Sequence, residues 1–114
     1  MEDCIFCKIA GGQIPSARVY EDDICLAFND LSPQAPTHIL IIPLEHTDSL
    51  DQAKNEQKEM LGHLLLTAAN IAREKGFADN GYRVVINTNS DGGQTVFHLH
   101  LHLLAGRPFI FPPG

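Results

Sequence analysis

The order of hydrophobic and polar residues along the chain predicts several short strands and one long helix. In the strand-like runs, apolar residues either alternate with polar ones or fill both faces, and Gly, Pro, Asn and Asp bound the runs. The predicted strands are a hairpin over residues 17–30 and single strands over residues 38–43, 81–87 and 96–106. The run over residues 38–43 is apolar on both faces, which predicts a central place in a sheet.

Residues 49–75 predict the long helix, because apolar side chains recur there every three or four positions. The predicted buried stripe consists of Met60, Leu61, Leu64, Leu65, Ala68, Ile71 and Ala72. Asp48 or Ser49 can cap the start of this helix, and Gly76 is suited to end it. His63 falls off the stripe and is interpreted as a surface residue without a role.

The order hairpin, strand, helix, strand, strand predicts an α+β fold. It contains a five-stranded, mainly antiparallel sheet, one long helix and a short N-terminal helix that ends near Gly11 and Gly12. At 114 residues the chain suits a single domain, residues 1–114, with a hydrophobic core of its own.

Composition and charge narrow the classes of partner. A formal net charge of −6 and a pI of about 5.3 argue against a protein that binds nucleic acid by neutralising many phosphates. The longest clean apolar run, "HILIIPL", is far shorter than the roughly 20 residues that a membrane span needs. The first ten residues lack the layout of a signal peptide, and three cysteines are an odd set for a disulfide framework. We therefore expect a cytoplasmic protein that binds neither nucleic acid nor membranes.

Histidine and leucine alternate in "HLHLHLL", so that three of the six histidines of the chain fall within five residues. On a strand, His98, His100 and His102 project from one face with their α-carbons roughly 6.5–7 Å apart. The opposite face carries the predicted core residues Phe97, Leu99, Leu101 and Leu103. Two alternatives for the row are a polar strand face that merely contains histidines, and a metal site.

The loop before this strand adds a candidate anion site. Its sequence "SDGGQT" contains two glycines, whose backbone N–H groups can approach an anion closely. Gln94 and Thr95 add an amide and a hydroxyl. A neutral imidazole is a nucleophile at pH 7, and a second imidazole can stabilise developing charge. An anion loop beside a row of histidines therefore favours phosphoryl chemistry.

The stretch "QTVFHLHLHLL" resembles the His-x-His-x-His-x-x motif, with x apolar, of the histidine triad (HIT) superfamily. The segments "IFCKIAGGQIPSARVYEDDICLAFNDLSPQAPTHILIIP" and "GYRVVINTNSDGGQTVFHLHLHLLAGRP" and the ending "PPG" resemble its Hint branch, over nearly the whole chain. The resemblance implies a HIT-like fold and a nucleotide hydrolase without a catalytic cofactor. It implies purine nucleoside 5′-phosphoramidates as substrates, such as adenosine 5′-monophosphoramidate. It also implies a homodimer in which two five-stranded sheets join into one.

The resemblance further implies roles for single residues. His100 corresponds to the nucleophile that becomes transiently nucleotidylated, and His102 corresponds to a contact of the α-phosphate. His38 corresponds to a histidine that hydrogen-bonds the nucleophile and orients its ring, although alone it is equally well interpreted as a histidine at the end of a loop. The implied phosphate and ribose contacts are Asn87, Gly93, Gln94 and Thr95.

A pocket for the base is implied in the same way. Asp30 corresponds to an acceptor for the ribose hydroxyls, and Leu31 to a contact of ribose and base. The implied apolar lining is Ile5, Phe6, Ile9, Ile14 and Phe28, which without the resemblance are ordinary core residues. Two positions depart from the family. Thr95 stands where relatives often have serine and keeps the hydroxyl, and Phe111 replaces a frequent tryptophan, which leaves the leaving-group preference open.

Cys4 and Cys7 have the Cys-x-x-Cys spacing of half a zinc site, and alone they are also consistent with a redox pair or two buried thiols. In relatives with this pair, zinc binding involves two further histidines, which correspond here to His46 and His98. A structural zinc ion on these four residues would make His98 a ligand, whereas without the ion His98 belongs to the catalytic group.

Other functions stay open at this point. Within enzymes the alternative is a dinucleoside polyphosphate hydrolase of a related branch. From another class, the alternative is a nucleotide-binding or scaffold protein with little turnover. A zinc-dependent hydrolase with the triad as its ligands would lose activity with a chelator.

Overall fold

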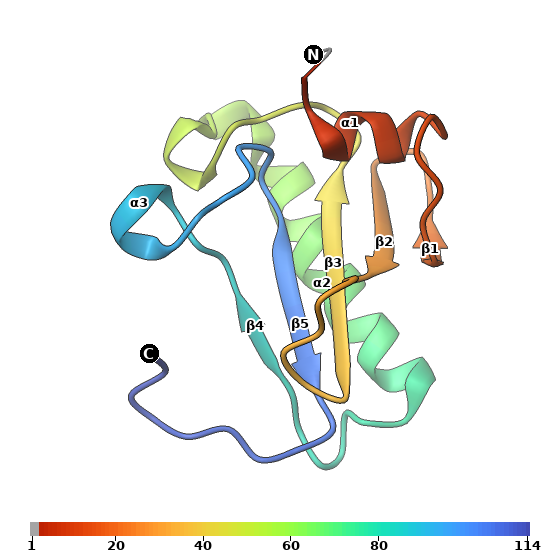
Figure 1. Ribbon diagram of the computed structural model, residues 1–114, viewed down its shortest axis with the longest axis vertical. Coiled ribbons are helices and arrows are strands. Elements are labelled where there is room, and N and C mark those ends of the chain that lie inside the picture. Colours follow the sequence, from red (N-terminus) through yellow and green to blue (C-terminus); the bar gives the residue numbers. More distant parts are fainter. Residues whose placement is uncertain (1–2) are drawn as a thin grey trace.

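The structure is a computed structural model that describes residues 3–114 (Figure 1). Five strands form one sheet in the order β1-β2-β3-β5-β4, and every neighbouring pair is antiparallel. The strands are β1 (Arg18–Glu21), β2 (Cys25–Asn29), β3 (Thr37–Pro43), β4 (Arg83–Val85) and β5 (Leu101–Ala105). The helices are α1 (Ile5–Ala10), α2 (Lys58–Lys75) and the single turn α3 (Asn89–Gly92). This architecture confirms the predicted α+β fold with its antiparallel sheet, long helix and short N-terminal helix.

The strand β3 lies at the centre of the sheet, as its two apolar faces predict. Ile39 and Ile41 belong to the core cluster that the sheet forms with α2, which lies behind the sheet in Figure 1. Leu40 and Ile42 point to the other face and pack in a second cluster with Phe6 of α1. Since α1 is only six residues long, this second face is covered at one end only, and its remainder is available to functional side chains.

The long helix begins at Lys58 and not at residue 49. Two 3₁₀ turns precede it, Leu50–Gln52 and Asn55–Gln57. Between them Lys54 has an extended backbone with φ −110° and ψ 161°, which interrupts any continuous helix. Gly76 ends α2 in the left-handed region with φ 84°, as predicted. No helix among the residues that the structure describes is both long and apolar enough to cross a membrane.

The last strand is also shorter than its alternating pattern predicts. β5 pairs with β3 only from Leu101 onward, whereas Leu99 donates its N–H to the carbonyl of Thr47 in the loop after β3. Residues 96–98 bend, so the alternation of a strand does not extend to Phe97, which is 50% exposed and lies outside the core. Leu65 of the predicted helix stripe is likewise 48% exposed.

Replacing Gly106 by alanine is expected to destabilise the protein by about 2–4 kcal/mol. Gly106 follows β5 with φ 100°, and a Cβ atom there would lie 2.7 Å from Cβ of Pro36. Gly62→Ala in α2 is the matched control, because nothing lies within 4 Å of its added Cβ atom. Alanine at that position should stabilise the helix by about 0.5–1 kcal/mol. Urea denaturation measures both changes, and an unchanged midpoint for Gly106→Ala would contradict the close approach to Pro36.

Candidate active site

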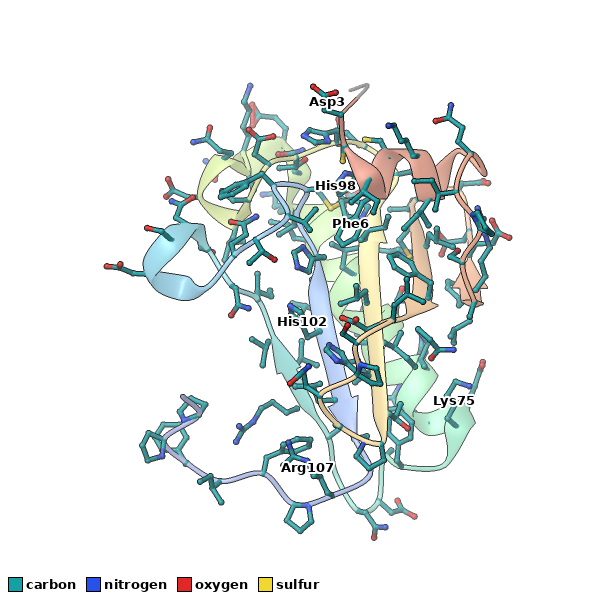
Figure 2. All side chains as sticks on the ribbon, in the orientation of Figure 1. Asp3, Phe6, Lys75, His98, His102 and Arg107 are labelled. Atoms are coloured by element: carbon teal, nitrogen blue, oxygen red, sulfur yellow. The ribbon has the colours of Figure 1, made fainter. Side chains whose placement is uncertain are left out.

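The histidine row lies on the face of the sheet opposite α2 (Figure 2). His102 belongs to β5, His100 comes just before this strand, and His98 lies in the bend that precedes it. In the register of the sheet, His102 lies opposite Leu40 of β3. His38 precedes Leu40 by two residues, so it projects from the same face as His102. Strand pairing thus brings a fourth histidine, 64 positions away in the sequence, against the row.

One ring nitrogen of His100 makes a hydrogen bond. The other has no hydrogen-bond partner among residues 3–114. Its Nδ1 lies 2.8 Å from the carbonyl oxygen of His98. A carbonyl can only accept, so Nδ1 carries the proton and Nε2 keeps its lone pair. Phe6 packs edge-on against the ring, with centroids 5.1 Å apart. Burial lowers the pKa of His100, which favours the neutral, nucleophilic form.

His38 bonds a different histidine from the predicted one. Its Nε2 lies 2.9 Å from Nδ1 of His102, whereas the Nδ1 bond of His100 goes to a backbone carbonyl. The prediction that His38 bonds and orients His100 is therefore wrong in this structure. The reason is the sheet register, which sets His38 diagonally across from His102. Burial lowers the pKa of His38, and burial together with the neighbouring His100 and His38 lowers the pKa of His102 to about 4.

A cleft of about 300 Å³ opens beside these rings. Its lining includes the five apolar residues predicted for the base pocket and five of those predicted for ribose, phosphate and catalysis: Ile5, Phe6, Ile9, Ile14, Phe28, Asp30, Leu31, Thr95, His100 and His102. Leu31 is 96% exposed at its rim, so a bound ligand could cover it. An apolar cleft that ends in two imidazoles and one carboxylate can hold a flat ring at one end and a polar group at the other.

The loop before the row is built differently from an open anion cradle. Gly93 caps α3 in the left-handed conformation, and its N–H donates to the carbonyl of Ser90. The N–H of Gln94 donates to the carbonyl of Asn89. Both N–H groups therefore make hydrogen bonds within the protein, whereas the sequence predicts backbone N–H groups of this loop that approach an anion.

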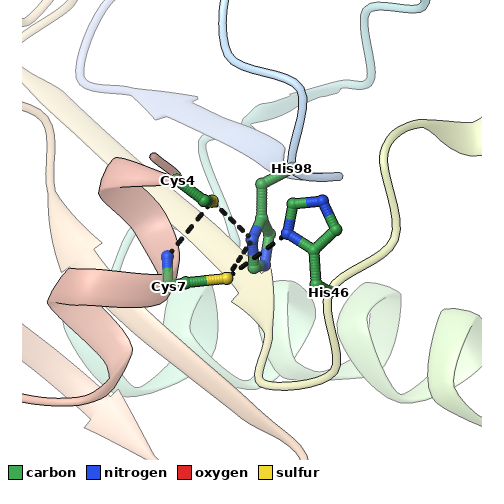
Figure 3. Close-up of side chains that lie close together, drawn as sticks. All are labelled: Cys4, Cys7, His46 and His98. Carbon is green, nitrogen blue, oxygen red and sulfur yellow. Dashed lines mark hydrogen bonds between the residues drawn. The ribbon is translucent and has the colours of Figure 1, made fainter. Parts of the chain in front are cut away.

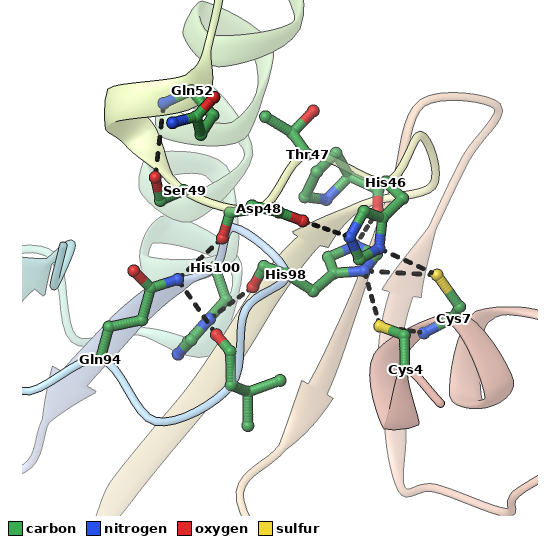
Figure 4. A network of polar contacts seen from close by, with 12 residues as sticks. Cys4, Cys7, His46, Thr47, Asp48, Ser49, Gln52, Gln94, His98 and His100 are labelled. Carbon is green, nitrogen blue, oxygen red and sulfur yellow. Dashed lines mark hydrogen bonds and ion pairs between the residues drawn. The ribbon is translucent and has the colours of Figure 1, made fainter. Parts of the chain in front are cut away.

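The side chain of Gln94 also makes its hydrogen bonds within the protein (Figure 4). It is 6% exposed, accepts from the N–H of Asn89, and donates to the carbonyls of Asp48 and Val96. Gln94 thus holds the loop in place. The cleft lining includes Thr95 but does not include Asn87, Gly93 or Gln94.

A second cluster brings together Cys4, Cys7, His46 and His98, with one possible ligand atom from each residue and all four atoms within 4.8 Å of one another (Figure 3). Nδ1 of His98 lies 3.2 Å from Sγ of Cys4 and 3.5 Å from Sγ of Cys7. Nδ1 of His46 lies 3.3 Å from Sγ of Cys7. These separations fit a tetrahedral zinc ion, whose ligand atoms lie roughly 3.3–3.8 Å apart when the bonds are 2.0–2.3 Å long.

The hydrogen bonds of His98 and His46 on the side away from the sulfurs also fit a zinc site. Nε2 of His98 lies 2.8 Å from the carbonyl of Pro43, and Nε2 of His46 lies 2.7 Å from Oδ1 of Asp48. These acceptors place the proton on Nε2 and leave the lone pair of Nδ1 facing the sulfurs, which is the second-sphere pattern of metal-bound histidine. Both ring nitrogens of His98 thus make contacts outside the cleft, and His98 is not among the residues that line the cleft.

His63, which the sequence analysis interprets as a surface residue without a role, makes a contact that the sequence does not predict. Its Nε2 lies 2.7 Å from Oδ2 of Asp22, in the turn between β1 and β2. The other oxygen of Asp22 accepts the N–H groups of Ile24 and Cys25. Hydrogen bonds from these groups and from Tyr20 hold the pKa of Asp22 well below its usual value, against the opposing effect of burial. No sequence pattern marks this pair, because it joins a helix and a turn 41 positions apart.

Comparison with known proteins decides the family. Residues 11–109 match the sequence profile of the HIT domain. The chain belongs to the HIT family. This HIT protein is 55% identical over 113 residues to a HIT-like protein of Synechocystis sp., covering 99% of this chain and 98% of that one.

Two further relatives carry names that describe an activity. The chain is 50% identical over 107 residues to the purine nucleoside phosphoramidase of Escherichia coli K12, covering 94% of this chain and 90% of that one. A HIT family hydrolase from Legionella pneumophila, known from its crystal structure, superimposes with a TM-score of 0.96 at 49% identity. That match covers 98% of this HIT protein and the whole of the other chain. The comparisons thus confirm the resemblance and the fold that the sequence predicts.

Proposed function

We propose that this HIT protein is a hydrolase that cleaves purine nucleoside 5′-phosphoramidates through a nucleotidyl intermediate on His100. The observation that carries the proposal is the state of His100, which keeps a lone pair on Nε2 beside an apolar cleft of about 300 Å³. The apolar lining suits a purine, and the carboxylate of Asp30 at the cleft suits ribose hydroxyls. The similarity to a purine nucleoside phosphoramidase over 94% of the chain supports this class of substrate.

The reaction follows in two balanced steps. Nε2 of His100 attacks phosphorus, a histidine–phosphorus bond forms, and the phosphorus–nitrogen bond to the leaving amine breaks. The amine leaves with a proton from the solvent, which the hydroxyl of Thr95 in the cleft can relay. Water then attacks the same phosphorus, the histidine–phosphorus bond breaks, and the proton that water releases returns to the solvent. The products are the amine and the nucleoside 5′-monophosphate, and an N–H of His102 stabilises the charge on phosphate oxygen.

We also propose a structural zinc ion on Cys4, Cys7, His46 and His98. The separations of the ligand atoms and the outer bonds of both histidines support this donor set. A bound ion would supply folding free energy by tying α1 to the sheet, because Cys7 lies in α1 and His98 just before β5. Under this assignment His98 is a ligand, and the catalytic group consists of His100, His102 and His38.

A homodimer is part of the proposal, and β4 supports it. β4 is an edge strand that pairs only with β5 among residues 3–114, so its outer edge is available to a second copy. We also propose a location in the cytoplasm, because three cysteines are an odd set for the disulfide framework of a secreted protein.

Steady-state kinetics on two substrates tests the proposed function. We expect kcat/KM for an adenosine phosphoramidate to exceed that for diadenosine polyphosphate by at least about 100-fold. A reversed order would support the dinucleoside polyphosphate hydrolase. Binding of adenosine monophosphate without turnover of either compound would support a nucleotide-binding protein. An assay after brief addition of a chelator is the control, because a structural ion leaves the rate unchanged, whereas a catalytic ion does not.

A further inference from the structure

A backbone N–H group outside the cleft lies where it can control the position of a proton on His102. The N–H of Gln34 donates to Nδ1 of His38 over 3.0 Å. A backbone N–H can only donate, so Nδ1 of His38 is an acceptor and carries no proton. The one proton of neutral His38 therefore lies on Nε2.

The next hydrogen bond passes this polarity on. Nε2 of His38 donates to Nδ1 of His102 over 2.9 Å, so the proton of neutral His102 lies on its Nε2. Oδ2 of Asp30 lies 3.5 Å from Nε2 of His38 and favours the same proton position. Because burial lowers the pKa of both rings, they are neutral at pH 7, and the tautomer decides what His102 offers to a ligand.

We propose that Gln34 is a positioning residue whose backbone N–H, acting through His38, holds His102 in the tautomer that presents an N–H to substrate phosphate. His102 lies beside His100, with ring centroids 5.0 Å apart. His100 is held in the opposite tautomer by the carbonyl of His98. Two neighbouring neutral imidazoles are thus set by backbone groups to different tasks, one as a nucleophile and one as a hydrogen-bond donor. The catalytic consequence of this inference rests on the proposed function.

The backbone of Gln34 is held in place by its own carbonyl, and the side chain adds one bond within the loop. Its carbonyl accepts from Nη2 of Arg107 over 3.1 Å, and its side-chain Nε2 donates to the carbonyl of Ser32 over 2.9 Å. In the same loop Pro36 lies against Gly106, where no Cβ atom would fit. The segment after β5 therefore supports the loop that carries the N–H group.

Nuclear magnetic resonance of the substrate-free wild type, labelled with ¹⁵N, tests the inference directly. Scalar couplings across N–H···N hydrogen bonds are expected between the Gln34 amide nitrogen and Nδ1 of His38, and between Nε2 of His38 and Nδ1 of His102. Long-range ¹H–¹⁵N spectra at pH 7 should show the Nε2–H tautomer for His38 and His102, and the Nδ1–H tautomer for His100. A His102 ring protonated on Nδ1, or no coupling from Gln34, would overturn the inference.

Two variants then measure the effect on the reaction. Gln34→Pro removes the N–H group, whereas the control Gln34→Ala keeps it and loses only the side-chain bond to Ser32. We expect kcat to fall about tenfold in Gln34→Pro with KM within about twofold, since the donor of His102 is lost in only part of the molecules. Gln34→Ala should stay within about twofold of the wild type in both constants. Equal kcat values for the two folded variants would contradict the inference.

The wild-type couplings decide the question alone if circular dichroism shows that Gln34→Pro does not fold. Failure of the proposed function gives a different result from failure of this inference. In the first case the couplings are present and the wild type does not cleave phosphoramidates. In the second case the wild type is active and the couplings are absent.

Discussion

Replacing His100 by alanine is expected to lower kcat for an adenosine phosphoramidate by at least about 10⁴-fold, because the reaction loses the atom that bonds to phosphorus. The cleft keeps its apolar walls in this variant, since Phe6 and Phe28 come from α1 and β2. The affinity for adenosine monophosphate should therefore stay within about threefold of the wild type. Steady-state kinetics and isothermal titration calorimetry measure the two quantities separately.

His63→Ala is the matched control for the loss of a histidine. His63 bonds Asp22 at the turn between β1 and β2 and does not line the cleft, so its removal should leave kcat within about twofold of the wild type.

Rapid acid-free quenching of the wild type should also trap a nucleotidyl group on His100, detectable by mass spectrometry of its peptide. Near-wild-type turnover of His100→Ala would end the proposed mechanism.

Replacing Cys7 by serine is expected to abolish zinc binding and to lower the melting temperature by roughly 10 °C or more. Serine is a poor zinc ligand, and a site that loses one of four ligands loses most of its affinity. The expected loss is about 3 kcal/mol of folding free energy, at roughly 4 °C for each kcal/mol in a domain of this size. Mass spectrometry under native conditions, on protein purified without chelator, should count one zinc ion per chain in the wild type.

Cys25→Ala is the control for the loss of a thiol. Cys25 is fully buried in β2 and contacts Thr67, so its removal costs packing but leaves the metal count at one. Calorimetry with and without added zinc separates the two variants, because only Cys7→Ser should have a melting temperature that zinc no longer raises. A wild type that binds much less than one zinc ion per chain would refute the structural site.

Much of the fold follows from local pattern. The double-sided apolar run of β3 predicts a central strand, because a strand without a polar face cannot lie at a solvated edge. Gly76 predicts the end of α2, because the left-handed conformation is accessible to glycine. The start of α2 could not be predicted in this way. Gln57 bonds the side chain of Thr47, so a contact with the loop after β3 accompanies the break before Lys58.

The sequence by itself determined the family, the row of three histidines and the Cys-x-x-Cys spacing of Cys4 and Cys7. These features are local, since they depend on spacing along the chain and on the alternation of a strand. Spacing and alternation alone place His98, His100 and His102 in equivalent positions, so that different roles for them follow from the sequence only through the family resemblance.

Only the tertiary structure decided which ring nitrogen of each histidine has a hydrogen-bond partner. Nε2 of His98 meets the carbonyl of Pro43, Nδ1 of His100 meets the carbonyl of His98, and Nδ1 of His102 meets His38. Each contact selects which ring nitrogen carries the proton, and two of them join groups more than 50 positions apart in the sequence. The physical reason is that an imidazole has two interchangeable nitrogens, so its chemistry depends on the partners that folding brings to each of them.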